Sequence, residues 1–94
     1  MVGWALFAQD NLTVSGEPLR YQSSEHATRH FCGRCGTGLF YTNPVTFPDM
    51  VDIQTGTLDD PAAFPPVIHV QYAEAAPWMD GIADLPRFDR YPEG

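Results

Sequence analysis

The feature that most constrains this chain is a pair of cysteines, Cys32 and Cys35, in the run Phe-Cys-Gly-Arg-Cys-Gly-Thr-Gly-Leu. Each cysteine is followed by a glycine, and Gly33 and Gly36 permit the sharp backbone turn that points two thiolates at one ion. Backbone N–H groups in such a turn, and the arginine between the cysteines, favour the thiolate form. The spacing therefore predicts a zinc knuckle, a tight turn whose two cysteines bind the same metal.

One C-x-x-C supplies two ligands, whereas a structural zinc normally takes four. Two other interpretations of the pair remain open. A redox dithiol usually places its first cysteine at a helix N-terminus in a βαβ unit. Two buried inert thiols, or a disulfide formed without metal, also fit the spacing. The flanking glycines and the strand-like run at 39–42 favour a zinc half-site.

The composition limits the classes of partner. A chain of 94 residues predicts a single domain, 1–94, near the size at which a metal or a partner chain often supports the core. It has no lysine, and five arginines face twelve acids, giving a net charge of −7. This charge argues against nucleic acid and against anionic membrane surfaces. With no membrane span, no charged signal region and only two cysteines, we expect a cytoplasmic protein with reduced thiols.

Short apolar or alternating runs, separated by Gly, Pro, Asn and Asp, predict an all-β fold. The expected strands are 2–8, 12–14, 19–22, 27–31, 39–42, 50–55 and 67–72, with helical turns at 61–64 and 74–79 and a proline-rich surface tail at 80–94. The two strands that flank the knuckle should form a hairpin. Pro65 and Pro66 forbid continuation of the first helical turn.

Several motifs occur in an order that is typical of one family. They are the aromatic-rich strand at 2–7, G-E-P-L-R-Y at 16–21, R-H-F-C-G-R-C-G-T at 29–37, G-T-L-D-D-P at 56–61, H-V at 69–70, A-P-W at 76–78 and L-P-R-F at 85–88. Together they cover nearly the whole chain. In these motifs the sequence resembles the glutathione-dependent formaldehyde-activating enzyme family, which also includes centromere protein V.

The resemblance implies a tent-like fold of small antiparallel sheets with a zinc knuckle. It also implies zinc-dependent carbon–sulfur lyase activity on an adduct of glutathione and an aldehyde. In that family a structural zinc takes two cysteines from an N-terminal C-x-C and two from the knuckle, matched here by Cys32 and Cys35. A second, catalytic zinc uses a further N-terminal cluster, C-x-C-x-x-C. Formaldehyde, glutathione and zinc are therefore the expected substrates and cofactor.

Both N-terminal cysteine clusters are missing from residues 1–94. The chain resembles the C-terminal two-thirds of the family's domain, and we expect a truncated member that carries only half of the structural zinc site. The catalytic residues stay unknown, and the sequence leaves open whether this chain is an enzyme. The alternative is a non-catalytic zinc-binding or protein-interaction domain.

Three histidines are candidates for completing the metal site. His30 lies two residues before Cys32, and positions i and i+2 of a strand share a face. A partly buried or surface histidine is the competing interpretation of His30. His26 falls in a predicted loop and should be exposed to solvent. His69 lies among apolar strand residues, where it would either line a substrate groove or be a core histidine with one hydrogen bond.

Other side chains have both a functional and a structural interpretation. Asp59 and Asp60 are paired carboxylates, but the proline after them favours a turn and a helix N-cap. Thr37 and Arg29 would suit the carboxylate of an anionic ligand such as glutathione. Aromatic residues, which could line a pocket or form the core, are Trp4, Phe7, Phe40, Tyr41 and Trp78.

The apolar run from Val2 to Phe7 predicts association between chains. An exposed apolar strand presents free backbone groups that can pair with another chain. A two-fold homodimer buries the same edge on both copies and closes the assembly. Such a dimer would also supply four cysteines if it brought two knuckles together around one shared zinc.

Overall fold

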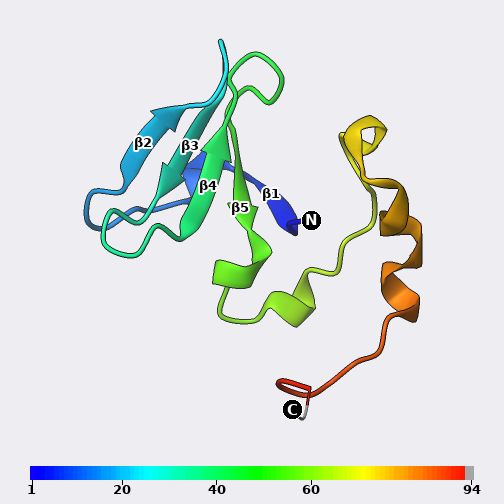
Figure 1. Ribbon diagram of the computed structural model, residues 1–94. Coiled ribbons are helices and arrows are strands. Elements are labelled where there is room, and N and C mark those ends of the chain that lie inside the picture. Colours follow the sequence, from blue (N-terminus) through cyan, green and yellow to red (C-terminus); the bar gives the residue numbers. More distant parts are fainter. Residues whose placement is uncertain (93–94) are drawn as a thin grey trace.

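The computed structural model describes residues 1–92, in which one antiparallel sheet is followed by a long C-terminal segment (Figure 1). The strands are β1 (Trp4–Ala8), β2 (Leu19–Gln22), β3 (Thr28–Phe31), β4 (Gly38–Thr42) and β5 (Met50–Gln54). Their order across the sheet is β1-β5-β4-β3-β2. The predicted all-β class is confirmed, although the described residues form one five-stranded sheet and not several small ones.

Most of the predicted strands form where the residue pattern placed them. β2 has the predicted bounds, and β3 and β4 pair as the expected hairpin around the cysteines, with Thr28 opposite Thr42. β1 pairs along its whole length with β5, from Trp4 opposite Gln54 to Ala8 opposite Met50. β-Branched and aromatic residues fill these strands because they pack well on a pleated, half-buried surface.

Two predicted strands are wrong, at 12–14 and at 67–72. Composition favours a strand at both places, but a strand forms only where a neighbour pairs with its backbone. Residues 12–14 follow a short 3₁₀ helix, η1 (Gln9–Asn11), and lead to Gly16, whose φ of +82° bends the chain. Residues 67–70 are irregular, and a left-handed residue, Gln71, ends them.

The remaining helical elements are short 3₁₀ turns. They are η2 (Thr55–Thr57), η3 (Pro61–Ala63), η4 (Tyr72–Glu74) and η5 (Pro77–Asp84). The helical turn expected at 61–64 is confirmed by η3, and η5 extends helical structure into the first part of the predicted tail. No helix within residues 1–92 is long and apolar enough to cross a membrane.

Strand pairing divides the side chains between two faces of the sheet. One face, the packed face, carries Ala5, Phe7, Arg20, His30, Phe40, Val51 and Ile53. Val51 is its centre and is 1% exposed, and the ring of Phe7 meets Phe64, just after η3, at 5.5 Å between centroids. The other face, the open face, carries Trp4, Leu6, Tyr21, Arg29, Tyr41, Asp52 and Gln54.

Candidate metal centre and the adjoining hollow

The turn between β3 and β4 is tightly hydrogen-bonded around the two cysteines. The Cys32 amide donates to the Thr37 carbonyl at 2.8 Å, and the Gly36 amide donates to the Cys32 carbonyl at 2.8 Å. Gly36 has a φ of +80°, a left-handed conformation that a side chain would strain. At Gly33 the missing side chain makes room for Leu19, whose Cγ lies 3.0 Å from the position of an added Cβ. A side chain at either glycine would therefore strain or displace this turn.

The thiols of this turn are free and accessible. Cys32 is half-buried and Cys35 is exposed, and no disulfide joins them. The Thr37 hydroxyl lies 3.0 Å from the sulfur of Cys35. This hydroxyl, the backbone of Thr37 and the neighbouring Cys32 thiol all lower the pKa of Cys35. Thr37, which the sequence suggested as a contact for an anionic ligand, instead supports a thiolate.

Among the described residues, no third metal ligand accompanies the two cysteines. Within the part of the chain that the structure describes, no group of three or more His, Cys, Asp or Glu side chains could hold a metal ion. His30 was the nearest candidate in sequence, but the ladder shifts register between His30 and Phe31, so the i, i+2 rule fails there. The imidazole of His30 stacks on Phe40 instead, with centroids 4.3 Å apart. Burial and the charge of Arg20 lower its pKa.

The other two histidines lie away from the knuckle. His26 is in an exposed loop, as predicted, and its Nε2 is 3.8 Å from a carboxylate oxygen of Glu25. His69 was expected in the core or facing a groove, and both expectations are wrong. It is exposed in the irregular segment after η3, where its ring meets Tyr72 at 5.2 Å, because no strand pairs with this segment.

The acidic pair, Asp59 and Asp60, lies in the turn that leads into η3. Asp60 occupies the N-cap position of η3 and its carbonyl accepts from the Ala63 amide, which confirms the predicted turn. The expected side-chain cap is wrong, because the Asp60 carboxylate makes no capping hydrogen bond. Asp59 and Asp60 are both exposed and lie in no group that could hold a metal.

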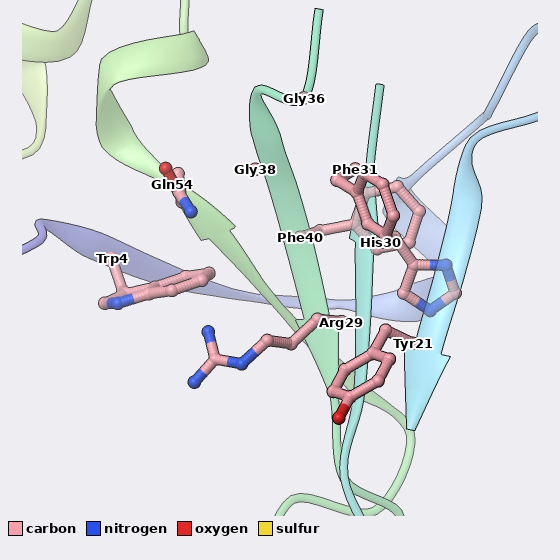
Figure 2. Close-up of a pocket in the computed structure, with 9 residues that line it drawn as sticks. All are labelled: Trp4, Tyr21, Arg29, His30, Phe31, Gly36, Gly38, Phe40 and Gln54. Atoms are coloured by element: carbon pink, nitrogen blue, oxygen red, sulfur yellow. The ribbon is translucent and has the colours of Figure 1, made fainter. Parts of the chain in front are cut away.

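A hollow of about 310 Å³ lies beside the cysteine turn (Figure 2). Its lining residues are Trp4, Tyr21, Arg29, His30, Phe31, Gly36, Gly38, Phe40 and Gln54. Figure 2 shows Trp4, Arg29 and Tyr21 around a common space. Gly36 belongs to the cysteine turn, and Gly38 begins the strand that leaves it. The hollow therefore adjoins the cysteine turn, although neither cysteine lines it.

Arg29 gives this apolar surface a single cationic centre. Its guanidinium lies over the ring of Tyr41, 5.6 Å from the ring centroid, and Trp4 meets the same ring at 6.2 Å. Within residues 1–92 no carboxylate lies within ion-pairing distance of Arg29. Asp52 is across the sheet, beyond Tyr41, and burial raises the pKa of its carboxyl. The hollow thus offers aromatic surface and a free guanidinium fork to a ligand.

Sequence reasoning named only some of these residues. It suggested Trp4, Phe40 and Arg29 but missed Tyr21 and Gln54. Strand alternation could have identified both residues, since Tyr21 lies opposite Arg29 and Gln54 lies opposite Trp4 on the same face. A side chain at Gly38 would collide with the Gln54 amide, so this glycine lets Gln54 lie over the strand. Of the other suggested aromatic residues, Phe7 is on the packed face and Trp78 is 69% exposed in η5.

The sheet, the knuckle and the hollow all fall within one family match. The model of the family described as glutathione-dependent formaldehyde-activating enzyme matches residues 2–74. The match includes all five strands and both cysteines. No curated protein and no solved structure matches the chain significantly.

Proposed function

We propose that this chain, which belongs to the glutathione-dependent formaldehyde-activating enzyme family, supplies the thiol-binding surface and half of a zinc site of a carbon–sulfur lyase. The substrate is an adduct of glutathione and an aldehyde. The observation that carries the proposal is the continuity of the hollow with the cysteine turn through Gly36 and Gly38. A ligand in the hollow would have its sulfur close to the cysteine pair.

Cys32 and Cys35 fit zinc as two of its four ligands. Their turn has the hydrogen bonds and the left-handed glycine of a knuckle, and Cys35 is biased toward the thiolate that zinc requires. The described residues offer no group of three ligands, and in this proposal the other ligands come from outside them. When bound, zinc would hold a thiolate or polarise an oxygen. Reduced thiols suit a reducing compartment such as the cytoplasm.

The hollow fits the peptide part of a glutathione adduct. Glutathione carries carboxylates, and the unpaired guanidinium of Arg29 can bind one of them in a bidentate manner. The rings of Trp4 and Tyr21 cover the peptide, and the Gln54 amide can hydrogen-bond its backbone. In the lyase direction the carbon–sulfur bond breaks and the hydroxyl proton of the adduct leaves, giving aldehyde and thiol without any redox change.

A binding titration with S-methylglutathione, which cannot react at sulfur, tests this proposal. In a Trp78→Phe background Trp4 is the only tryptophan, and its fluorescence reports the hollow. Arg29→Gln should weaken binding about tenfold or more, because a charged hydrogen bond contributes about 1.5–3 kcal/mol. Arg20→Gln is the matched control, since Arg20 lies on the opposite face. Equal affinity for the two variants would contradict the assignment of Arg29.

The half-site has a consequence for activity. Residues 1–94 with added zinc should not accelerate the reaction of glutathione with formaldehyde above its spontaneous rate. The reason is that a catalytic zinc is held by about three protein ligands with one open position, and only two cysteines meet here. Rapid, zinc-dependent loss of free formaldehyde with the purified chain would show that the catalytic site is already complete.

A second candidate is a non-catalytic zinc-binding or interaction domain. It is favoured by the finding that no group of three or more metal-ligating side chains comes together in the described residues. The two candidates differ in ligand binding. Zinc binding without any affinity for S-methylglutathione would support the interaction domain. Affinity for both, lost separately in Cys35→Ser and Arg29→Gln, would support the lyase.

A further inference from the structure

One apolar segment of the chain has no partner in the structure. This segment, Val67-Ile68-His69-Val70, is called the arm here. Its three aliphatic side chains are 87%, 73% and 71% exposed in chain order. Within residues 1–92 no backbone hydrogen bond involves the arm. Its residue types are those of a strand, so the arm has the composition of a β-strand and lacks only a neighbour.

The outer edge of β1 has no paired strand in the described part of the chain. β1 is the first strand in the order across the sheet and pairs with β5 on one side alone. Its other side presents a row of free N–H and C=O groups, which is a template for a further strand. Near this edge Met1, Val2 and Leu6 are 85%, 55% and 45% exposed. The edge has five residues and the arm has four, so their lengths correspond.

The exposed area shows how much surface remains to be covered. The accessible surface is 8141 Å², whereas a compact monomer of 10.4 kDa exposes about 5,400 Å² by the usual scaling with mass. The radius of gyration is 15.7 Å, against about 12 Å for a compact domain of this length. The excess, about 2,700 Å² per chain, exceeds the roughly 800 Å² that each partner contributes to a standard stable interface.

The path of the chain directs the arm away from its own sheet. The contact between Phe64 and Phe7 holds the end of η3 against the packed face. Pro65 and Pro66 follow at once and keep the backbone extended. Figure 1 shows the chain running from η3 away from the sheet. Within residues 1–92, each chain thus has one free arm and two sheet edges without a neighbour, β1 and β2, of which β1 carries the more apolar residues.

We propose that two copies exchange arms, so that the arm of each chain pairs with the outer edge of β1 of the other. A reciprocal exchange pairs both arms with both β1 edges and closes as a two-fold dimer. Alternate side chains of the added strand face opposite sides of the extended sheet, with Val67 and His69 on one side and Ile68 and Val70 on the other. This inference does not rest on the proposed function.

The order of the strands also determines what the dimer does to the metal site. The knuckle joins β3 and β4, and β5 lies between β4 and β1. With strands about 4.8 Å apart, the knuckle lies roughly 10 Å from the outer edge of β1, where the partner's arm would pair. One zinc needs all its sulfurs about 2.3 Å away. Pairing of the arm with β1 therefore does not by itself bring the two cysteine pairs to one zinc.

Light scattering after size exclusion, with the full chain at about 50 μM, tests the exchange. At this concentration a dimer with a dissociation constant of about 1 μM is mostly formed. The wild type should be a dimer. Ile68→Pro removes a backbone hydrogen-bond donor from the arm, and Val70→Asp places a charge in the arm. Each substitution should weaken dimerisation about tenfold or more. Neither residue contacts the sheet through the backbone, so circular dichroism should be unchanged. Val45→Asp, at a valine that is 63% exposed in another loop, is the matched control.

Hydrogen exchange identifies the two partners in the pairing. Amides of the arm and of β1 should become protected together as the concentration rises, and Ile68→Pro should abolish this protection. Four outcomes overturn the proposal. They are a monomer at all concentrations, a dimer indifferent to both arm variants, open-ended oligomers, and protection of the arm that does not depend on concentration. The last outcome would mean that the arm folds back onto its own β1.

Discussion

Replacement of Val51 by alanine should remove a large part of the stability of the sheet. Val51 is 1% exposed, and Ala27, at 3%, is the only other fully buried apolar residue among residues 1–92. The substitution deletes two methyl groups, worth about 0.8 kcal/mol each, and leaves a cavity that adds to the loss. The expected decrease in the free energy of unfolding is about 2–3 kcal/mol, which lowers the melting temperature by roughly 10–20 °C in a domain of this size.

The assay is urea unfolding followed by circular dichroism, with Val45→Ala as the matched control. Val45 is the same residue type but is 63% exposed, so its loss should change stability by about 0.5 kcal/mol or less. Small domains have only about 5–15 kcal/mol in total, and Val51→Ala should therefore unfold at a clearly lower urea concentration. Equal midpoints for the two variants would refute the assignment of the core to the packed face.

Three further predictions concern single sites. Burial raises the pKa of Asp52, so the free energy of unfolding falls as the pH rises through this pKa. Asp52→Asn should therefore be more stable than wild type at pH 7, and the urea midpoints of the two proteins should converge below the pKa of an unfolded aspartate. Gly36→Ala should lower zinc affinity about fivefold, since a left-handed alanine costs about 1 kcal/mol or more and nothing else obstructs the new methyl group. A double-mutant cycle on Phe7 and Phe64 should give a coupling of about 0.5–1.5 kcal/mol, and a coupling of zero would show that η3 is not docked.

The sequence predicted those elements whose partners are close in the chain or strongly patterned. The hairpin of β3 and β4 followed from two strand-like runs around a glycine-rich turn, and it formed. The arm was predicted as a strand from residue types alone. Propensity describes how a residue fits a pleated surface, but the hydrogen bonds of a strand depend on a neighbour that local sequence does not reveal.

The candidate site was predictable to the same extent. The cysteine turn was evident from spacing, because a sharp turn with two thiols needs its glycines at fixed positions. Of the two interpretations of His30, the partly buried histidine is confirmed, and a register shift between His30 and Phe31, which nothing in the sequence marked, separates its side chain from the cysteines. Tyr21 and Gln54 joined the hollow through strand order, which links residues more than thirty positions apart.

The most direct test of the metal half-site is cobalt substitution. Titration of the reduced chain with Co²⁺ should produce the thiolate-to-cobalt charge-transfer absorption of bound cysteine, and added zinc should abolish it by displacement. Cys32→Ser and Cys35→Ser should each lose most of the absorption, whereas Arg34→Gln, in the same turn, should keep it. An absence of the band in the wild type, or a band that survives both serine substitutions, would contradict the assignment of Cys32 and Cys35 to a metal.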